Sequence, residues 1–415
     1  MKDSTFGAAG FSASWQQDTS WKADPRFTSE TGETVEPLRI RATPFSYRDP
    51  AGFPKRRWLY GRHLIRKYIS CTVAPAGIGK SSLLLVEAVA LATGRNLTGK
   101  QVHEGAVRVW LINLEDPLEE LERRVLAILL YYKIDPADLG DRLFLDSGRT
   151  VKVVLAHATK SGVQIATPVV DALKAEIRER AIDVLIVDPM VKAHRVVEND
   201  NSAIDMVCTE FAGIADETEC AIELVHHVKK GTGVEITVED GRGASALLGA
   251  VRSARVLNPM SKDEAEKAGG LIARDYFRDT NGKANLAPPP DRSDWYHKVS
   301  VSLGNGVGGI IDDSDHVGVV EQWQWPDLME KVTLDHLKRV QVKVMQGTYR
   351  ENHMAKDWVG KAVAEIMGLD VKKVGDKKVV QTALGAWFAS GALVRVMRPD
   401  AHRELKPFVE VGDTG

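Results

Sequence analysis

Cysteine is scarce in this 415-residue sequence, which contains only Cys71, Cys208 and Cys220. Their number is odd and their spacing is not that of metal ligands, so neither a disulfide framework nor a cysteine-based metal site is supported. We interpret the three as small core residues of a protein in a reducing compartment. Uninterrupted apolar runs of 18 residues are also missing, and the N-terminal segment lacks the apolar core of an export signal. These absences predict a cytoplasmic protein that neither spans a membrane nor is exported.

Net charge is almost absent as well. The formal net charge at pH 7 is −2, which excludes a chain that is basic throughout. The charges are nevertheless segregated, because residues 331–415 carry 15 Lys and Arg against 10 Asp and Glu. A local excess of positive charge is typical of a protein with one end that faces nucleic acid. The length of the chain suggests two domains with a tail.

Hydrophobic patterning divides the chain into three parts. Residues 1–55 are mostly polar with little periodicity, which predicts a flexible N-terminal tail. Residues 56–325 alternate nearly continuous apolar segments with amphipathic ones, and this predicts an α/β domain with a mostly parallel sheet covered by helices. The elements expected there are strands over 68–73, 106–114, 182–188, 221–228, 270–277 and 297–303, and helices over 81–94, 117–132, 169–181 and 201–220.

Residues 326–415 form the third part, with a different order of elements. Helices over 357–370 and 377–391 precede two short strands joined by a polar loop, which is typical of a winged-helix-like domain. Basic residues that would neutralise DNA phosphates gather at the second helix and on the strands, namely Lys372, Lys373, Lys377, Lys378, Arg395, Arg398, Arg403 and Lys406. The alternative is a solvated helix face on a protein–protein adaptor.

The segment "CTVAPAGIGKSS" (71–82) lies between a strand and a helix and ends like the phosphate-loop pattern G-x-x-x-x-G-K-[ST]. Ala74 stands where the pattern has its first glycine. Small residues let backbone N–H groups surround phosphates, while a lysine reaches the β- and γ-phosphates and a serine holds Mg²⁺. An ordinary strand-to-helix turn has no need of Lys-Ser at this place. We therefore predict ATP binding by Ala76, Gly77, Ile78, Gly79, Lys80, Ser81 and Ser82.

Carboxylates follow two of the expected strands. Asp188 ends the strand "VLIVD", from which it would bind Mg²⁺ together with Ser81; capping of the next turn is the alternative. "NLEDP" places Glu115 and Asp116 after the strand over 106–114. We expect Glu115 to be the base that orients the attacking water, and Asp116 to cap the helix that follows.

The motifs together resemble those of the RecA-like P-loop ATPases, and most closely those of the RepA-type hexameric helicases of plasmids and phages, a group of AAA-family ATPases. The resemblance covers about residues 58–290. It depends on "APAGIGKSS", "LEDP…RR", "VDP", "HHVKKG", "RGASAL…VR" and "GKAN".

The resemblance implies roles for single residues. Glu115 is the base and Asp188 is the Walker B carboxylate. His226 is a sensor that links the γ-phosphate to DNA-facing loops. Arg252 is a finger that enters the active site of the neighbouring subunit, with Arg242 and Lys283 as weaker candidates. Arg124, nine residues after Glu115, is expected to pack against adenine. Each of these roles has an alternative. His226 could be a hydrogen-bonded structural histidine, Arg252 could form a surface ion pair, and Arg124 could lie on a solvated helix face.

We therefore expect a Mg²⁺- and ATP-dependent DNA helicase that forms a ring, with a hexamer expected, on single-stranded DNA. Its partner would be a replication initiator or a primase. Two alternatives stay open, an ATP-switched regulatory DNA-binding protein without unwinding activity and a RecA-like recombination or repair ATPase. The glycine-rich stretch over 304–309 fits G-x-G-x-x-G, but acidic residues and no helix follow it. We expect a loop between strands there, not a dinucleotide site.

Overall fold

The computed structural model describes residues 41–228, 235–240, 244–288, 290–307, 313–330, 332–399 and 403–412. The chain divides into two units, Met1–Lys55 and Arg56–Gly415. In the first unit, the described residues contain one short 3₁₀ helix, η3 (Pro50–Gly52). Most of the tail expected over 1–55 lies outside the described residues.

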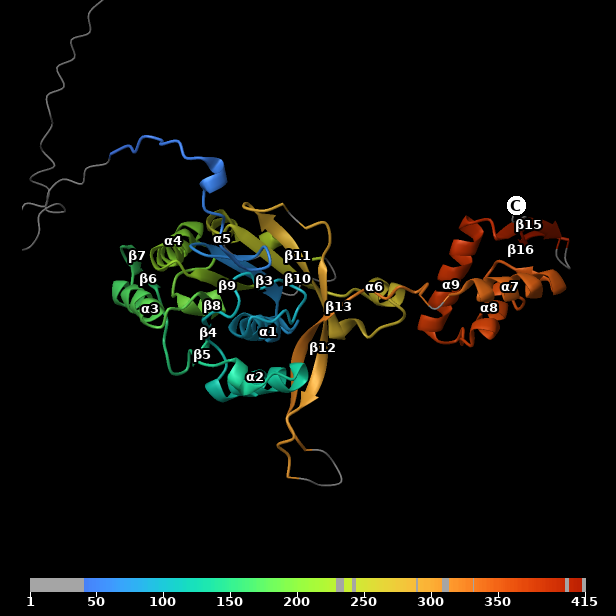
Figure 1. Cartoon of the computed structure of the whole chain (residues 1–415), viewed down its shortest axis with the longest axis horizontal. Helices are drawn as coiled ribbons and strands as arrows, with labels where there is room; N and C mark the ends of the chain where they lie inside the picture. Colours follow the sequence, from blue (N-terminus) through green and yellow to red (C-terminus); the bar gives the residue numbers. More distant parts are fainter. Residues whose placement is uncertain are drawn as a thin grey trace, which may run out of the picture. The chain divides into compact units, whose positions relative to one another are not determined.

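A nine-stranded sheet forms the centre of the described part of the second unit (Figure 1). Six neighbouring strands are parallel, in the order β10 (Ser253–Pro259), β3 (Ile69–Pro75), β9 (Ala221–Val228), β8 (Val184–Asp188), β4 (Val109–Asn113) and β5 (Leu143–Ser147). Three antiparallel strands extend the β10 edge, namely β11 (Tyr276–Ala284), β12 (Asp294–Ser302) and β13 (His316–Trp323). The prediction of a mostly parallel sheet is confirmed.

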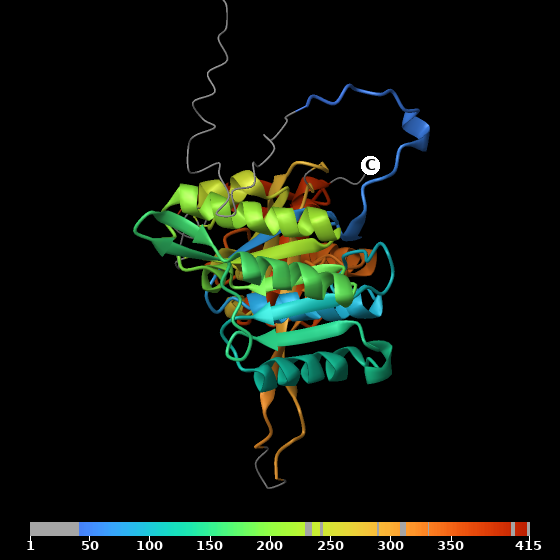
Figure 2. The same cartoon turned by 90° about the vertical axis from the view of Figure 1, so that its left-hand side faces the viewer.

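Helices cover both faces of this sheet, as the two views show (Figure 2). Strand residues alternate between two hydrophobic clusters, because successive side chains of a strand point to opposite faces. One cluster is closed by α1 (Lys80–Thr93) and α2 (Leu118–Tyr132). The other is closed by α3 (Thr167–Glu179), α4 (Asn201–Thr218) and α5 (Ala244–Ala250). All three cysteines are buried core residues, as expected.

Several elements of the core differ from the sequence-based expectation. The basic segment over 240–257, which includes the motif "RGASAL…VR", is expected from its sequence to form a glycine-rich loop and a helix. Its described part instead holds the short α5 and then strand β10. The edge strand β5 is not expected from the sequence, whereas β13 is the strand that the loop expected over 304–309 requires after it. The remaining short elements are β1 (Trp58–Tyr60) with β2 (Leu64–Ile65), β6 (Ala156–Thr159) with β7 (Gly162–Ile165), and α6 (Lys262–Lys267).

The C-terminal part has its own hydrophobic cluster, built around Val363, Val380 and Trp387. The expected order of two helices and two strands is present as α8 (Val359–Met367), α9 (Val374–Ala389), β15 (Leu393–Pro399) and β16 (Leu405–Val411). A further helix and a further strand precede them, α7 (Leu334–Gln346) and β14 (Tyr349–Arg350). β14, β16 and β15 form a three-stranded antiparallel sheet. Assignment to the winged-helix class stays a prediction.

Among the residues that the structure describes, no helix has both the length and the apolar character that crossing a bilayer requires.

Candidate nucleotide-binding site

The loop between β3 and α1 has a backbone that requires glycine. Gly77 and Gly79 have φ angles of +77° and +112°, in the left-handed region that L-amino acids avoid. A Cβ atom on Gly79 would also lie 3.0 Å from Cδ of Lys298. Ala74, in contrast, is a fully buried residue of β3, paired in register with His227 of β9. The position of the missing first glycine is therefore a strand position that a small side chain fills.

Lys80 and Ser81, the first residues of α1, both contact Asp188 at the end of β8. Lys80 Nζ lies 3.0 Å from Asp188 Oδ1, and the Ser81 hydroxyl donates to Asp188 Oδ2 at 2.7 Å. Strand β9 lies between β3 and β8, so these residues meet across one intervening strand. The structure thus brings together two parts of the predicted site that are more than 100 residues apart in the sequence.

Asp188 is buried, yet it is held in its ionised form. Burial acts to raise its pKa, but contacts with His227, Lys80 and Ser81 outweigh burial and lower the pKa to about 2. A carboxyl with a lowered pKa stabilises the fold above its unfolded pKa of about 3.9, and this contribution is lost as the pH falls toward 2. Asp188 is therefore an anion at any pH near neutrality.

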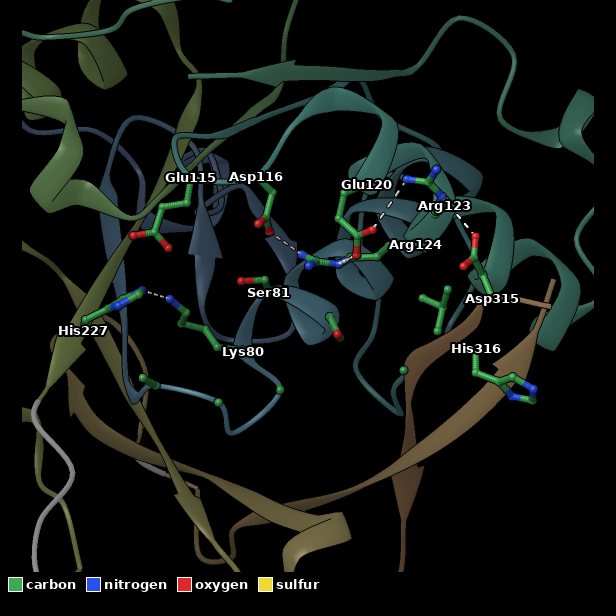
Figure 3. Close-up of a pocket in the computed structure, with 16 residues that line it drawn as sticks. Lys80, Ser81, Glu115, Asp116, Glu120, Arg123, Arg124, His227, Asp315 and His316 are labelled. Carbon is green, nitrogen blue, oxygen red and sulfur yellow. Dashed lines mark hydrogen bonds and ion pairs between the residues drawn. The ribbon is translucent and has the colours of Figure 1, made fainter. Parts of the chain in front are cut away.

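The histidine that faces this site is His227, not His226. His227 Nε2 contacts Lys80 Nζ, and His227 lines the cleft described below (Figure 3). His226 is buried on the other face of β9, beside His194 and Leu247, because neighbouring strand residues point to opposite faces. Burial lowers the pKa of His226, and its Nε2 has no hydrogen-bond partner among the described residues. Of the two histidines, the structure therefore places His227, and not the predicted sensor His226, in contact with Lys80.

Glu115 lies at the same cleft, beyond the end of β4. The side-chain oxygen of Asn113 accepts from the backbone N–H groups of Glu115 (3.0 Å) and Asp116 (2.7 Å), which fixes this turn. Glu115 is exposed, and its carboxylate is directed into the cleft on the side of Lys80 and His227 (Figure 3). The structure thus places Glu115 on the same cleft as the phosphate loop.

Asp116 does not cap α2, in contrast to our expectation. The N-cap residue is Pro117, without a side-chain cap. Asp116 Oδ2 instead accepts from Arg124 Nη1 at 2.8 Å, and Glu120 Oε1 accepts from Arg124 Nε at 2.9 Å (Figure 3). An ion pair with a residue two turns along the helix thus replaces the capping hydrogen bond. Arg124 is thus held between two carboxylates, through its Nε and Nη1.

These side chains surround one cleft of about 590 Å³. Ile78 is buried and is not part of the lining, whereas the other residues predicted for the phosphate loop are. At the far end from the loop, Arg123 Nε of α2 lies 3.4 Å from Asp315 Oδ2, just before β13. The complete lining is Ala76, Gly77, Gly79, Lys80, Ser81, Ser82, Glu115, Asp116, Glu120, Arg123, Arg124, His227, Asp315, His316, Val317 and Gly318.

Arg252 and Lys283, two of the three basic residues predicted to act between subunits, do not line this cleft. The backbone N–H of Arg252 donates to Ile69, the first residue of β3, whereas the phosphate loop follows the last residue of that strand. At about 3.3 Å per residue, Arg252 is roughly 20 Å from the loop of its own subunit. Lys283 lies on the adjacent strand β11, opposite Ala254. Arg242 lies outside the described residues.

The wall formed by residues 315–318, at and just before the start of β13, is not predicted from the sequence, because these residues are more than 200 positions away from the phosphate loop. The glycine-rich stretch over 304–309 does lie between strands β12 and β13, as expected, although residues 308–312 are outside the described part. No helix of the described chain begins there.

Residues 34–233 match the family model of the AAA domain. The match supports a P-loop ATPase-type domain over this part of the chain, and with it nucleotide binding. It includes the phosphate loop, Glu115, Asp188 and His227, and it ends before β10.

Proposed function

We propose that the protein is a ring-forming ATPase that uses Mg²⁺-ATP to move along single-stranded DNA, as a RepA-like replicative helicase. One observation carries the ATPase part of the proposal: Lys80, Ser81 and Asp188 converge at a glycine-dependent loop, with Glu115 on the same cleft. The AAA-domain match supports the same activity.

The residues present fit a magnesium ion. The Ser81 hydroxyl and the Asp188 carboxylate are oxygen donors that already lie side by side, and Mg²⁺ prefers such ligands. When bound, the ion neutralises charge on the transferred phosphoryl group. Lys80 exchanges its contact with Asp188 for the β- and γ-phosphates, and Glu115 orients the attacking water. His227, which contacts Lys80, is the residue that we propose as the γ-phosphate sensor in place of His226.

We further propose that Arg124 stacks on the base of the nucleotide. Asp116 and Glu120 hold its Nε and Nη1, which orients a planar cationic group at the wall of the cleft. Arg124→Leu is then expected to weaken ATP binding by about 2- to 30-fold while leaving tripolyphosphate binding unchanged. Calorimetric titration of both ligands measures this difference, with the exposed Arg178→Leu as control. Equal losses for ATP and tripolyphosphate would contradict a role in base binding.

Two observations support the DNA part of the proposal. The first is the resemblance of the motifs to those of RepA-type helicases. The second is that Lys372, Lys373, Lys377 and Lys378, at and just before the start of α9, make no ion pair with any described residue, so their charges are available to phosphates. Three of the four basic residues expected on the strands are already paired, Arg395 with Glu351, Arg398 with Glu410 and Lys406 with Glu404.

The ring explains the position of Arg252. At its distance from the loop of its own subunit, this arginine can act only on the nucleotide of a neighbour. A finger supplied in this way typically accelerates hydrolysis about 10³- to 10⁵-fold, so assembly would be a condition of activity.

The proposed function is tested by an ATPase assay with and without single-stranded DNA. Lys80→Ala is expected to weaken ATP binding about 10- to 100-fold, because a charged hydrogen-bond partner of the phosphates is removed, and to abolish hydrolysis. The exposed Lys152→Ala serves as control. Arg252→Ala is also expected to be inactive, and mixing it with Lys80→Ala to restore part of the activity.

The outcomes separate the alternatives. Normal hydrolysis by Arg252→Ala would contradict the finger assignment. Hydrolysis that DNA stimulates, together with strand separation of a forked duplex, supports the motor. A nucleotide-dependent shift of duplex DNA without unwinding would favour the regulatory protein, and strand exchange would favour the recombination ATPase.

A further inference from the structure

A second cavity lies in the C-terminal part, on the exposed face of α9. Its volume is about 330 Å³. On α9, Gln381, Gly385 and Phe388 follow one another at spacings of four and three residues, which places them on one face of the helix. The lining consists of Glu351, Asn352, His353, Trp358, Gln381, Leu384, Gly385, Phe388, Arg395 and Pro407.

One wall of this cavity is a layered cation–aromatic pair. The guanidinium carbon of Arg395 lies 4.2 Å from the centroid of the Phe388 ring. Arg395 is held there by Glu351, whose Oε1 accepts from Arg395 Nε at 2.7 Å. Unstacked bases of single-stranded nucleic acids stack on such aromatic and guanidinium planes. The amides of Asn352 and Gln381 lie at the same cavity and have the donors and acceptors that base edges require.

Positive charge leads to the cavity along the same helix face. Lys377 and Lys378 precede Gln381 by four and three residues, and neither makes an ion pair with a described residue. Lys378 and Gly385 are seven residues apart, about 10 Å along the helix axis. Phosphate-binding lysines and an apolar, stackable cavity thus follow one another over a short distance, which is the combination that single-strand binding uses.

We propose that this cavity takes an unstacked base of single-stranded nucleic acid whose phosphates contact Lys377 and Lys378. It is a binding site separate from the nucleotide cleft, and it distinguishes single strands from duplexes because a paired base cannot enter it. The site does not depend on the proposed ATPase activity.

The absence of a side chain on Gly385 provides a direct test. A Cβ atom at this position meets nothing within 4 Å, so a larger residue would extend into open space without straining the helix. Gly385→Leu therefore fills the cavity, whereas Ala386→Leu, on the next and also exposed residue, adds a leucine outside its lining. The full-length chain is titrated, without ATP, into labelled thymidine and uridine tetranucleotides and into a labelled abasic tetranucleotide. Fluorescence anisotropy measures the affinity for each.

Gly385→Leu is expected to weaken binding of the base-containing tetranucleotides by about 5- to 100-fold, on DNA, RNA or both, and to leave the abasic one unchanged. Ala386→Leu should bind all three tetranucleotides like wild type. The double variant Lys377→Gln, Lys378→Gln should bind all three more weakly. Wild-type affinity in Gly385→Leu would overturn the proposal and favour a protein segment as the occupant. The proposal would also be overturned if Gly385→Leu lost as much affinity for the abasic tetranucleotide as for the base-containing ones. Because ATP is left out, failure of this site and failure of the ATPase give different results.

Discussion

Glu115→Gln is expected to bind Mg²⁺-ATP with the affinity of wild type and to hydrolyse it about 10²- to 10⁴-fold more slowly. The carboxylate lies on the cleft beside Lys80 and His227. In the proposed mechanism it accepts a proton from the attacking water as the bond to the γ-phosphate forms. The isosteric amide keeps the shape of the site but does not accept this proton. Single-turnover hydrolysis of bound ATP separates the chemical step from binding.

Two variants control this experiment. Glu119→Gln removes an exposed carboxylate in the first turn of α2 that does not line the cleft, and it should hydrolyse ATP like wild type. Asp116→Asn tests the neighbouring carboxylate, which is paired with Arg124 and should affect binding more than hydrolysis. If Glu115→Gln remained active and Asp116→Asn did not, the base would be Asp116.

Arg255→Met is expected to lower the free energy of unfolding of the core by about 3–5 kcal/mol. This arginine of β10 is 2% exposed, and its guanidinium group donates to both carboxylate oxygens of Glu87 in α1, at 2.7 and 2.6 Å. Its Nε also donates to Thr72 Oγ1 at 2.7 Å. The substitution leaves the buried Glu87 without its partner, and α1, which begins with Lys80, loses its attachment to β10. Urea denaturation followed by circular dichroism measures the change.

Replacement of both partners should cost less than replacement of one. In Arg255→Met combined with Glu87→Leu, no charge of the pair remains buried, so the double variant is expected to recover at least part of the loss. Arg180→Met provides the matched surface control, because Arg180 forms an exposed pair with Glu176 that contributes about 1 kcal/mol or less. A double variant less stable than Arg255→Met would contradict the unpaired charge as the cause.

The role of Arg255 also shows where sequence-based inference stopped. The sequence places Arg255 in the same segment as Arg242 and Arg252, two of the residues predicted to act between subunits, and assigns Arg255 no role of its own. The structure places Arg255 inside the sheet, paired with a helix residue 168 positions away. No local pattern distinguishes a buried arginine of this kind from an exposed one, because its partners come from α1 (Glu87), β3 (Thr72) and β11 (Asp279, 3.4 Å from Arg255 Nη1).

The sequence by itself determined the phosphate loop, the parallel α/β core and the carboxylates that follow its strands. These are local signals: a strand, a glycine loop that needs positive φ, and a helix are contiguous, and the carboxyl ends of parallel strands share one edge of a sheet. Only the tertiary structure decided that His227 and not His226 meets Lys80, since the pairing of β9 with β3 and β8 sets which face each histidine occupies. It also decided that Asp116 holds Arg124 and that β13 closes the cleft. These contacts join side chains that folding brings together from distant segments. Spacing along the chain does not determine which of them meet.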